Sequence, residues 1–325
     1  MALPLADLLS SLRVVALPLR TRFRGITVRE VALLEGPEGW TEFAPFLEYD
    51  DAEAASWLAA AIDFGWSPVP APLRSEIRVN ATVPAVVPTE VASILARYPG
   101  SRTAKIKVAE PTQSIDDDIA RVRMVRELLG PEGRLRVDAN GGWTVDGAER
   151  AIHALTEFDL EYVEQPCASV EELAELRTRI DYLDVPIAAD ESVRKASDPL
   201  AVARAGAADL LVIKAAPLGG IRRALEITQD AGLPVVVSSA LDSSIGLSMG
   251  AYLAASVPTL DFDCGLGTAA LLATDVTEEP LRPENGAIPV RRVTPSSDLL
   301  AQTAVSEERF RWWSERIRRT HALLD

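Results

Sequence analysis

The chain has 325 residues, and its 48% hydrophobic composition is sufficient for a large buried core in one or two domains. A formal net charge of −15 argues against nucleic acid or an anionic membrane as the main partner. The two cysteines, Cys167 and Cys264, are far apart, so we expect no disulfides and a reducing, cytoplasmic location. His153 and His321 are the only histidines, so a general base is expected to be Lys, Asp or Glu.

Neither apolar stretch of the sequence predicts a signal peptide or a membrane span. Asp7 and Arg13 interrupt the apolar N-terminus, and no small-residue cleavage site follows. Residues 243–258 carry no charge, but their serines, glycines and proline fit a buried helix better than a span.

The first part of the chain predicts a small α+β domain over residues 1–75. Strands are expected over 13–19, 28–34 and 40–44, with residues 20–25 separating the first two. A helix is expected from Asp50 or Asp51 to about Gly65, followed by a proline-rich linker. An amphipathic helix over 307–324 is predicted to pack back on this domain, so that residues 290–325 return to it.

From Glu76 onward, strands alternate with helices. Helices are expected over 90–98, 114–129, 144–158, 169–180, 197–205, 219–231 and 245–256. Strands are expected over 77–87, 104–108, 135–138, 161–164, 187–190, 210–214, 234–238 and 259–264, with a possible further strand in 287–293. Eight alternating units predict a closed (β/α)8 TIM-type barrel over residues 76–289. The alternative, an open doubly wound sheet, would need a G-x-G-x-x-G turn, and the sequence has none.

Three consecutive strands end in a carboxylate, and the next ends in a lysine. Asp138, Glu164, Asp190 and Lys214 recur at the pitch of one strand plus one helix. The carboxyl ends of barrel strands share one rim, where three acids would repel each other unless a cation lay between them. An all-oxygen donor set favours Mg²⁺, with Mn²⁺ as the next choice. The alternative is three unrelated helix N-caps.

Three lysines are expected to face the same rim of the barrel. Lys105 and Lys107 share one face of a strand, which is the interior face in a barrel, although a solvated strand end would give the same pattern. Lys214 is a single cation in a buried run, and buried lysines have lowered pKa values that suit a base. A metal flanked by lysines indicates removal of an α-proton from a carboxylate substrate, with the metal and an ammonium group stabilising the enediolate.

The strand-end motifs resemble those of the enolase superfamily, muconate-lactonising subgroup, over the whole chain. They are K-x-K at 105–107, D-x-N at 138–140, E-Q-P at 164–166, D-E-S at 190–192 and the lone Lys214. Within that superfamily, the stretches 23–30, 238–246 and 264–268 are similar to the actinobacterial branch of the o-succinylbenzoate synthases.

The resemblance implies a lyase of menaquinone biosynthesis. The expected reaction is the Mg²⁺-dependent syn dehydration of 2-succinyl-6-hydroxy-2,4-cyclohexadiene-1-carboxylate to 2-succinylbenzoate through an enediolate. Lys107 would remove the α-proton and protonate the departing hydroxyl, Lys214 would support the enediolate, and Lys105 would hold the substrate carboxylate. The remaining implied roles are metal binding by Asp138, Glu164 and Asp190, contact with the succinyl tail by Ser238, Ser239 and Gly265, and support of the ligands by Asn140 and Glu191, for which a purely structural role is the alternative. We expect a monomer whose partner is a small-molecule carboxylate.

Other functions fit parts of the pattern. With Lys107 and Lys214 as opposed acid/bases, the protein would be an N-acylamino acid racemase or dipeptide epimerase. Asp261 and Asp263 are similar to the acidic pair with which epimerases hold a substrate amine. A muconate-type cycloisomerase and a non-catalytic barrel that retained its site are further alternatives. Whether an arginine of the stretch 20–24 contacts substrate stays open.

Overall fold

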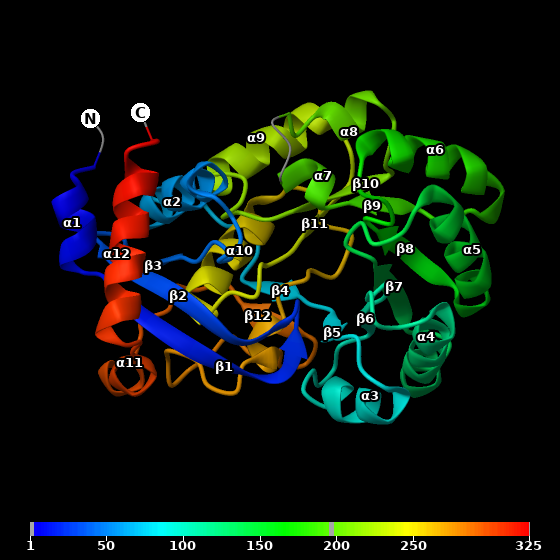
Figure 1. Cartoon of the computed structure of the whole chain (residues 1–325), viewed down its shortest axis with the longest axis horizontal. Coiled ribbons are helices and arrows are strands. Elements are labelled where there is room, and N and C mark those ends of the chain that lie inside the picture. The colour runs from blue at the N-terminus through cyan, green and yellow to red at the C-terminus, as the bar shows by residue number, and fades with distance from the viewer. Residues whose placement is uncertain (1–2, 195–197, 325) are drawn as a thin grey trace.

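The computed structural model describes residues 3–194 and 198–324 and is built around a parallel sheet (Figure 1). Seven strands follow each other in the order β11-β10-β9-β8-β7-β6-β5. Their bounds are β5 Ala81–Val83, β6 Thr103–Lys107, β7 Arg134–Asp138, β8 Leu160–Glu164, β9 Ile187–Ala189, β10 Leu210–Ile213 and β11 Val235–Val237. Each strand pairs in parallel with its neighbour in the sequence order, as alternating helices require.

The segment around Cys264 and Gly265 closes the sheet into a barrel. Parallel bridges join Cys264 to Val79 and Gly265 to Ser238. The amide of Gly265 donates to the carbonyl of Val237 at 2.8 Å, and a (β/α)8 TIM-type barrel is thereby confirmed. The predicted strand over 259–264 is wrong in its extent, because pairing begins only at its end. A Cβ at position 265 would clash with Ser238 Oγ, so any larger residue there would require the Ser238 side chain to rotate away.

The predicted helices surround the barrel, several with shifted ends. They are α3 Pro88–Leu95, α4 Ile115–Leu129, α5 Val145–Leu155, α6 Val170–Ile180, α8 Ala201–Arg204, α9 Ile221–Ala231 and α10 Ser244–Ser256. α5 stops early and continues as a 3-10 turn over Thr156–Phe158. The helix predicted over 197–205 is reduced to α8, and its residue 197 lies outside the described residues. The short α7, Glu191–Arg194, was not predicted, because four residues show no periodicity.

The N-terminal part of the chain forms a three-stranded antiparallel sheet and a helix. The elements are β1 Arg13–Phe23, β2 Ile26–Gly36, β3 Gly39–Phe43 and α2 Asp51–Trp66, preceded by α1 Leu5–Ser10. Asp50 caps α2 by accepting from the amide of Glu53, as predicted. The prediction that residues 20–25 separate two strands is wrong, because the strands continue to a two-residue turn at Arg24 and Gly25, where φ is 49° and 77°. Phe23 therefore lies at a hairpin tip.

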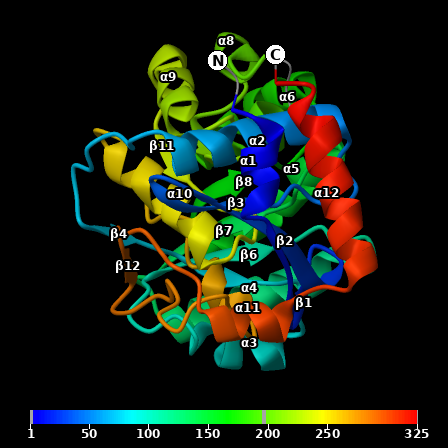
Figure 2. The ribbon, with the colours of Figure 1, turned by 90° about the vertical axis from the view of Figure 1, so that its left-hand side faces the viewer.

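The C-terminal segment completes this small unit, as predicted. β12 Ala287–Pro289 pairs with β4 Glu76–Arg78, and α11 Ser297–Thr303 leads to α12 Glu307–His321. Trp313 of α12 packs in one buried cluster with Trp57 of α2, and its Nε1 donates to Glu30 at 2.8 Å. Figures 1 and 2 show α1 beside α12, with the two chain ends close together. We call β1–β3, α2 and α12 the cap; a boundary between residues 75 and 76 stays a prediction.

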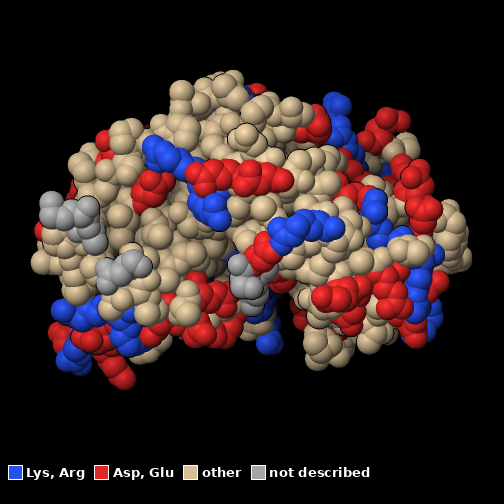
Figure 3. All heavy atoms as spheres, turned by 90° about the horizontal axis from the view of Figure 1, so that it is seen from above, with Lys and Arg blue, Asp and Glu red and all other residues tan. Residues whose placement is uncertain are grey.

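The surface and the thiols agree with the composition. Figure 3 shows acidic and basic side chains interspersed on the face seen from above. Within residues 3–194 and 198–324, no helix combines the length and the apolar character needed to cross a bilayer. Cys167 and Cys264 are buried free thiols.

A buried acid pair joins the cap to the barrel. Glu42 of β3 accepts from the backbone amide of Ser243, which caps α10, at 3.1 Å. Burial, and then repulsion from Asp242, raises the pKa of Glu42 to about 8. The guanidinium group of Arg29 attracts the carboxylates of both Glu42 and Asp242. Because the two carboxyl groups share this positive charge, we infer that one of them keeps a proton near neutral pH.

This pair predicts how stability depends on pH. Because the folded pKa of Glu42 lies above its ordinary value of 4.5, its stabilisation is complete below about pH 4.5 and is lost progressively as the pH rises to about 8. Glu42→Gln should therefore unfold about 2–4 °C higher than the wild type near pH 9, but not near pH 4, in thermal unfolding scans. Glu35→Gln, on the exposed part of β2, is the control and should follow the wild type at both pH values. A Glu42→Gln protein that loses stability near pH 9 would contradict the assignment.

Candidate active site

The strand ends bring the predicted acids and lysines together on one rim of the barrel. Lys107 at the end of β6 is paired in register with Asp138 of β7, which is in turn paired with Glu164 of β8. Asp190 directly follows β9, and Lys214 directly follows β10. All of these side chains and that of Lys105 are buried, with at most 8% of any residue exposed.

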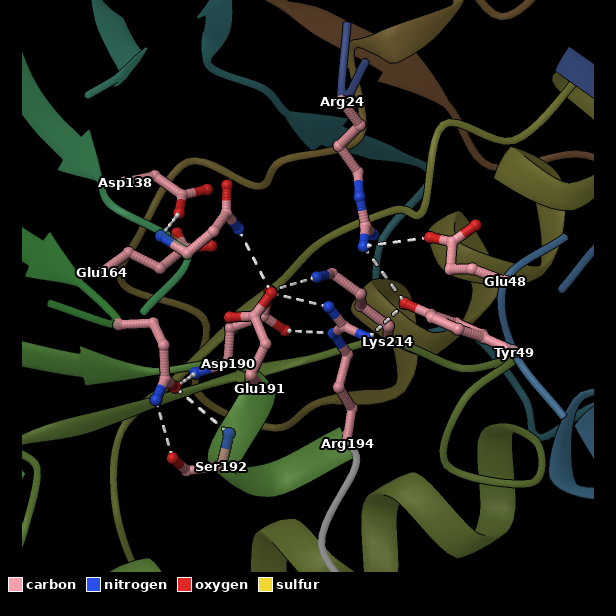
Figure 4. Close-up of polar contacts among 12 residues, drawn as sticks. Arg24, Glu48, Tyr49, Asp138, Glu164, Asp190, Glu191, Ser192, Arg194 and Lys214 are labelled. Carbon is pink, nitrogen blue, oxygen red and sulfur yellow. Dashed lines mark hydrogen bonds and ion pairs between the residues drawn. The ribbon is translucent and has the colours of Figure 1, made fainter. Parts of the chain in front are cut away.

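Each carboxylate of this cluster contacts an ammonium group. Figure 4 includes the contact of Lys214 with Asp190. Lys105 Nζ lies 3.0 Å from Asp138 Oδ2 and 2.7 Å from Glu164 Oε1. Lys107 Nζ lies 2.6 Å from Asp138 Oδ2, and Lys214 Nζ donates to Asp190 Oδ2. The whole chain has four lysines, so three of them lie in this one cluster, and the fourth, Lys195, is outside the described residues.

Burial and mutual attraction shift the pKa values in this cluster in different directions. Burial alone would raise the pKa of Asp138, but Lys105 and Lys107 hold it well below its ordinary value. Burial would likewise lower the pKa of Lys105, yet Asp138 and Glu164 raise it well above its ordinary value. Burial, and then repulsion from Asp138, raises the pKa of Glu164 to about 7. Burial lowers the pKa of Lys214 against the attraction of Asp190.

The donor set fits a hard divalent cation, although the side chains do not converge on one point as they stand. Among the described residues, no three acid, histidine or cysteine side chains are grouped closely enough to hold a metal, since lysine ammonium groups lie against the carboxylates. Glu164 Oε2 is buried and has no hydrogen-bond partner within the described part of the chain. A buried carboxylate oxygen without a hydrogen-bond partner, beside two further carboxylates, provides oxygen ligands of the kind that Mg²⁺ prefers.

Amide and acid side chains surround the cluster and tie the strand ends together. Asn140 Oδ1 accepts from Lys107 Nζ at 2.5 Å, and its Nδ2 donates to Glu191 Oε1 at 3.2 Å. Gln165 Oε1 accepts from the backbone amides of Asp190 and Ser192 at 2.9 and 3.1 Å. The Gln of the E-Q-P motif thus fixes the start of α7, a role that the sequence analysis did not assign.

The cap and the barrel loops enclose one cavity over the cluster. Ser238, Ser239 and Gly265, which the resemblance assigns to contact with the succinyl tail, line this cavity, and Ser239 Oγ donates to the carbonyl of Gly265 at 2.8 Å. Residues of the cap also line this cavity, and among them is Phe23, for which the sequence offered no signal; its ring centroid lies 5.5 Å from Lys107 Nζ. The remaining lining residues not named from the sequence are Phe46, Thr82, Arg194, Ala240, Leu241 and Thr268.

Two further sets of residues named from the sequence do not all line the cavity. The two aspartates lie outside it, and of the arginines in the stretch 20–24 one lines it. Asp263 accepts from Thr103, the first residue of β6, whereas the cavity lies at the last residue of that strand. Asp263 is therefore at the opposite end of the barrel, and Asp261 lines a separate surface groove near the start of β11. Of the arginines at 20 and 24, Arg24 lines the cavity, whereas Arg20 donates to the carbonyl of Leu272.

Comparison with solved structures places this architecture among enzymes of known fold. The muconate lactonizing enzyme from Pseudomonas fluorescens, complexed with muconolactone, superposes with a TM-score of 0.76 at 21% identity, covering 91% of this chain and 98% of that one. The dipeptide epimerase from Enterococcus faecalis gives 0.69 at 23% identity, covering 86% and 96%. At these identities the likeness shows a shared fold.

Sequence comparison is more specific. An enolase C-terminal domain-like model matches residues 89–295, and an enolase N-terminal domain-like model matches residues 14–65. The o-succinylbenzoate synthase of Mycolicibacterium smegmatis is 55% identical over 321 residues, which is 98% of each chain. That of Mycobacterium tuberculosis is 55% identical over 322 residues, or 99% of this chain and 97% of its own. The chain therefore belongs to the o-succinylbenzoate synthase family of the enolase superfamily, a family of lyases.

Proposed function

We propose that this protein dehydrates 2-succinyl-6-hydroxy-2,4-cyclohexadiene-1-carboxylate to 2-succinylbenzoate with Mg²⁺. The observation that supports it best is the cluster of Lys105, Lys107, Lys214 and three carboxylates on one rim, in a chain 55% identical to named synthases. Membership of the enolase superfamily implies a divalent cation. A place in menaquinone biosynthesis, a cytoplasmic location and a monomeric state remain predictions.

Lys107 is the proposed acid/base. Its side chain is 10% exposed and faces the cavity beneath Phe23, so that substrate can reach it while bulk water is largely kept out. As the neutral amine, Lys107 would take the α-proton from the ring carbon. The resulting ammonium group would then protonate the hydroxyl as it leaves. One group acting on both positions requires them to be on the same face of the ring, which makes the elimination syn.

Asp138, Glu164 and Asp190 would hold the cation, which when bound supplies positive charge to the substrate carboxylate as the α-proton leaves. Lys105, between Asp138 and Glu164, would orient the same carboxylate and is charged at neutral pH. Lys214 enters the cavity from β10 and would stabilise the negative charge that spreads over the ring.

The succinyl tail would extend toward the loops after β11 and after the closing segment. Ser238, Ser239 and Gly265 lie there, and the serine hydroxyls, which donate to the carbonyl of Gly265, would turn to donate to the tail. Asn140 and Glu191 would keep Lys107 and the cation ligands in place through their contacts at 2.5 and 3.2 Å.

A racemase or epimerase activity is the second candidate, and one observation favours it. Lys107 and Lys214 both line the cavity, so a small substrate between them could lose a proton to one and gain a proton from the other. Asp261 and Asp263 do not support this candidate, because neither lines the cavity.

The deciding experiment follows loss of the diene absorbance by the purified protein with Mg²⁺ and with a chelator. Loss of absorbance that stops with chelator and returns with Mg²⁺ is the expected result. If the diene is stable but the protein exchanges the α-hydrogen of N-acylamino acids or dipeptides with solvent deuterium, the second candidate replaces the first. If neither reaction occurs, both assignments fail.

A further inference from the structure

Arg194, the last residue of α7, donates hydrogen bonds from Nε, Nη1 and Nη2 to three different residues (Figure 4). Nε donates to Asp190 Oδ1 at 3.1 Å, and Nη2 donates to Glu191 Oε1 at 2.6 Å. Nη1 donates to the hydroxyl of Tyr49 at 2.9 Å. The side chain is 3% exposed, so each of these contacts is made away from water, where losing a partner is costly.

On the barrel side, the contacts of Arg194 lead to a proposed cation ligand and to the proposed base. Asp190 is a proposed cation ligand and contacts Arg194 directly. Glu191 Oε1, which accepts from Arg194, also accepts from Asn140, and Asn140 in turn accepts from Lys107. Two polar routes therefore lead from one guanidinium group to the cation site and to the proposed base.

The third contact of Arg194 belongs to the cap. Tyr49 lies just before α2, and its ring packs edge-to-face on Phe46 and Trp57 with centroids 5.5 and 6.2 Å apart. Arg316 of α12 donates to the Tyr49 carbonyl at 2.7 Å. The Tyr49 hydroxyl also accepts from Arg24 Nη2, at the hairpin tip over the cavity, at 3.3 Å. The position of this hydroxyl is therefore set by how the cap lies on the barrel.

We propose that Arg194 is a positioning residue that couples the seating of the cap over the cavity to the arrangement of Asp190 and Lys107. The planar guanidinium group suits this task, because it holds three acceptors in fixed directions, which an ammonium group on a flexible stem cannot do. Coupling between two sites is reciprocal, so a correctly seated cap strengthens cation binding, and a bound cation holds the cap. The roles of Asp190 and Lys107 rest on the proposed function, whereas the cation measurement does not depend on the substrate.

The first test is Tyr49→Phe, which keeps the aromatic packing and removes the oxygen that accepts from Arg194. Calorimetric titration of the substrate-free protein with Mg²⁺ should show affinity weakened about tenfold, the low end of the range for partners of metal ligands. Tyr252→Phe is the matched control, because Tyr252 of α10 also packs on a ring of the cap, Phe64 of α2, at 6.0 Å. The control should bind Mg²⁺ as the wild type does.

The second test is Arg194→Lys, which keeps a positive charge but cannot reach three partners. Mg²⁺ affinity and kcat for dehydration should each fall by about 10–100-fold. If Tyr49 acts through Arg194, adding Tyr49→Phe to the Arg194→Lys protein should weaken Mg²⁺ binding no further, whereas independent effects would add.

Three results would overturn the coupling. The first is a Tyr49→Phe protein with Mg²⁺ affinity and kcat within about twofold of the wild type. The second is an equal loss of affinity in Tyr252→Phe, which would show general loosening of the cap. The third is full additivity in the double variant. A wild type that binds Mg²⁺ but does not dehydrate the diene would refute the proposed function, and the loss of Mg²⁺ affinity in Tyr49→Phe would still establish the coupling to the cation site.

Discussion

Lys107→Ala is expected to lower kcat for dehydration by about 10²–10⁴-fold or more, because the same amine is asked to move both protons. Mg²⁺ should still bind, since Asp138 retains the contact with Lys105 at 3.0 Å and the other two carboxylates are untouched. The measurements are the initial rate of diene loss at saturating substrate and calorimetric titration with Mg²⁺.

Lys107→Arg separates charge from proton transfer. A guanidinium group would keep an ion pair with Asp138 but does not give up its proton at any usable pH. We expect this variant to be nearly as inactive as Lys107→Ala. Near-full activity in Lys107→Ala would refute the assignment of the base, and recovery in Lys107→Arg would mean that Lys107 supplies charge alone.

Glu164→Gln should remove most of the Mg²⁺ affinity and most of the activity. The amide keeps an oxygen at the end of β8 but loses the negative charge, so the cation site would be left with Asp138 and Asp190. Because a proposed ligand is removed, the loss should exceed the roughly 10–100-fold that is typical when a partner of a ligand is changed. Titration with Mg²⁺ and the dehydration assay at increasing Mg²⁺ both measure it.

Glu161→Gln is the control for this experiment, since Glu161 lies on the same strand and contacts Arg136 and Arg134, not the lysine cluster. It should bind Mg²⁺ with unchanged affinity even if it unfolds at a lower temperature. If Glu164→Gln binds Mg²⁺ as tightly as the wild type, Glu164 is not a ligand.

The barrel and its rim were predictable because the signals are local and repeat. A buried strand that ends in a carboxylate is visible at Asp138 and Glu164 without any tertiary information, and parallel strands put such ends on one rim. The last closing strand was misplaced because Cys264 and Gly265 pair through isolated bridges, which leave no run of alternating residues to detect.

The residues that surround the rim were not predictable in the same way. Tyr49 and Arg194 are 145 positions apart, and each alone is an ordinary residue next to a helix. Phe23 reaches Lys107 only because the hairpin turns at Arg24 and Gly25, later than the sequence pattern suggests. One available signal was overlooked: the chain has four lysines among its 33 basic residues, and three of them lie in or directly after interior strands.

That distribution makes the site accessible to spectroscopy. A sample labelled with nitrogen-15 at lysine alone would contain four ammonium groups, three of them from the cluster of Lys105, Lys107 and Lys214. Burial and hydrogen bonding slow the exchange of these protons with water, which brings their resonances into view. The resonances of Lys105 and Lys107 would report on the end of β6 and that of Lys214 on the end of β10, so the arrival of cation and substrate could be followed residue by residue in the unmodified enzyme.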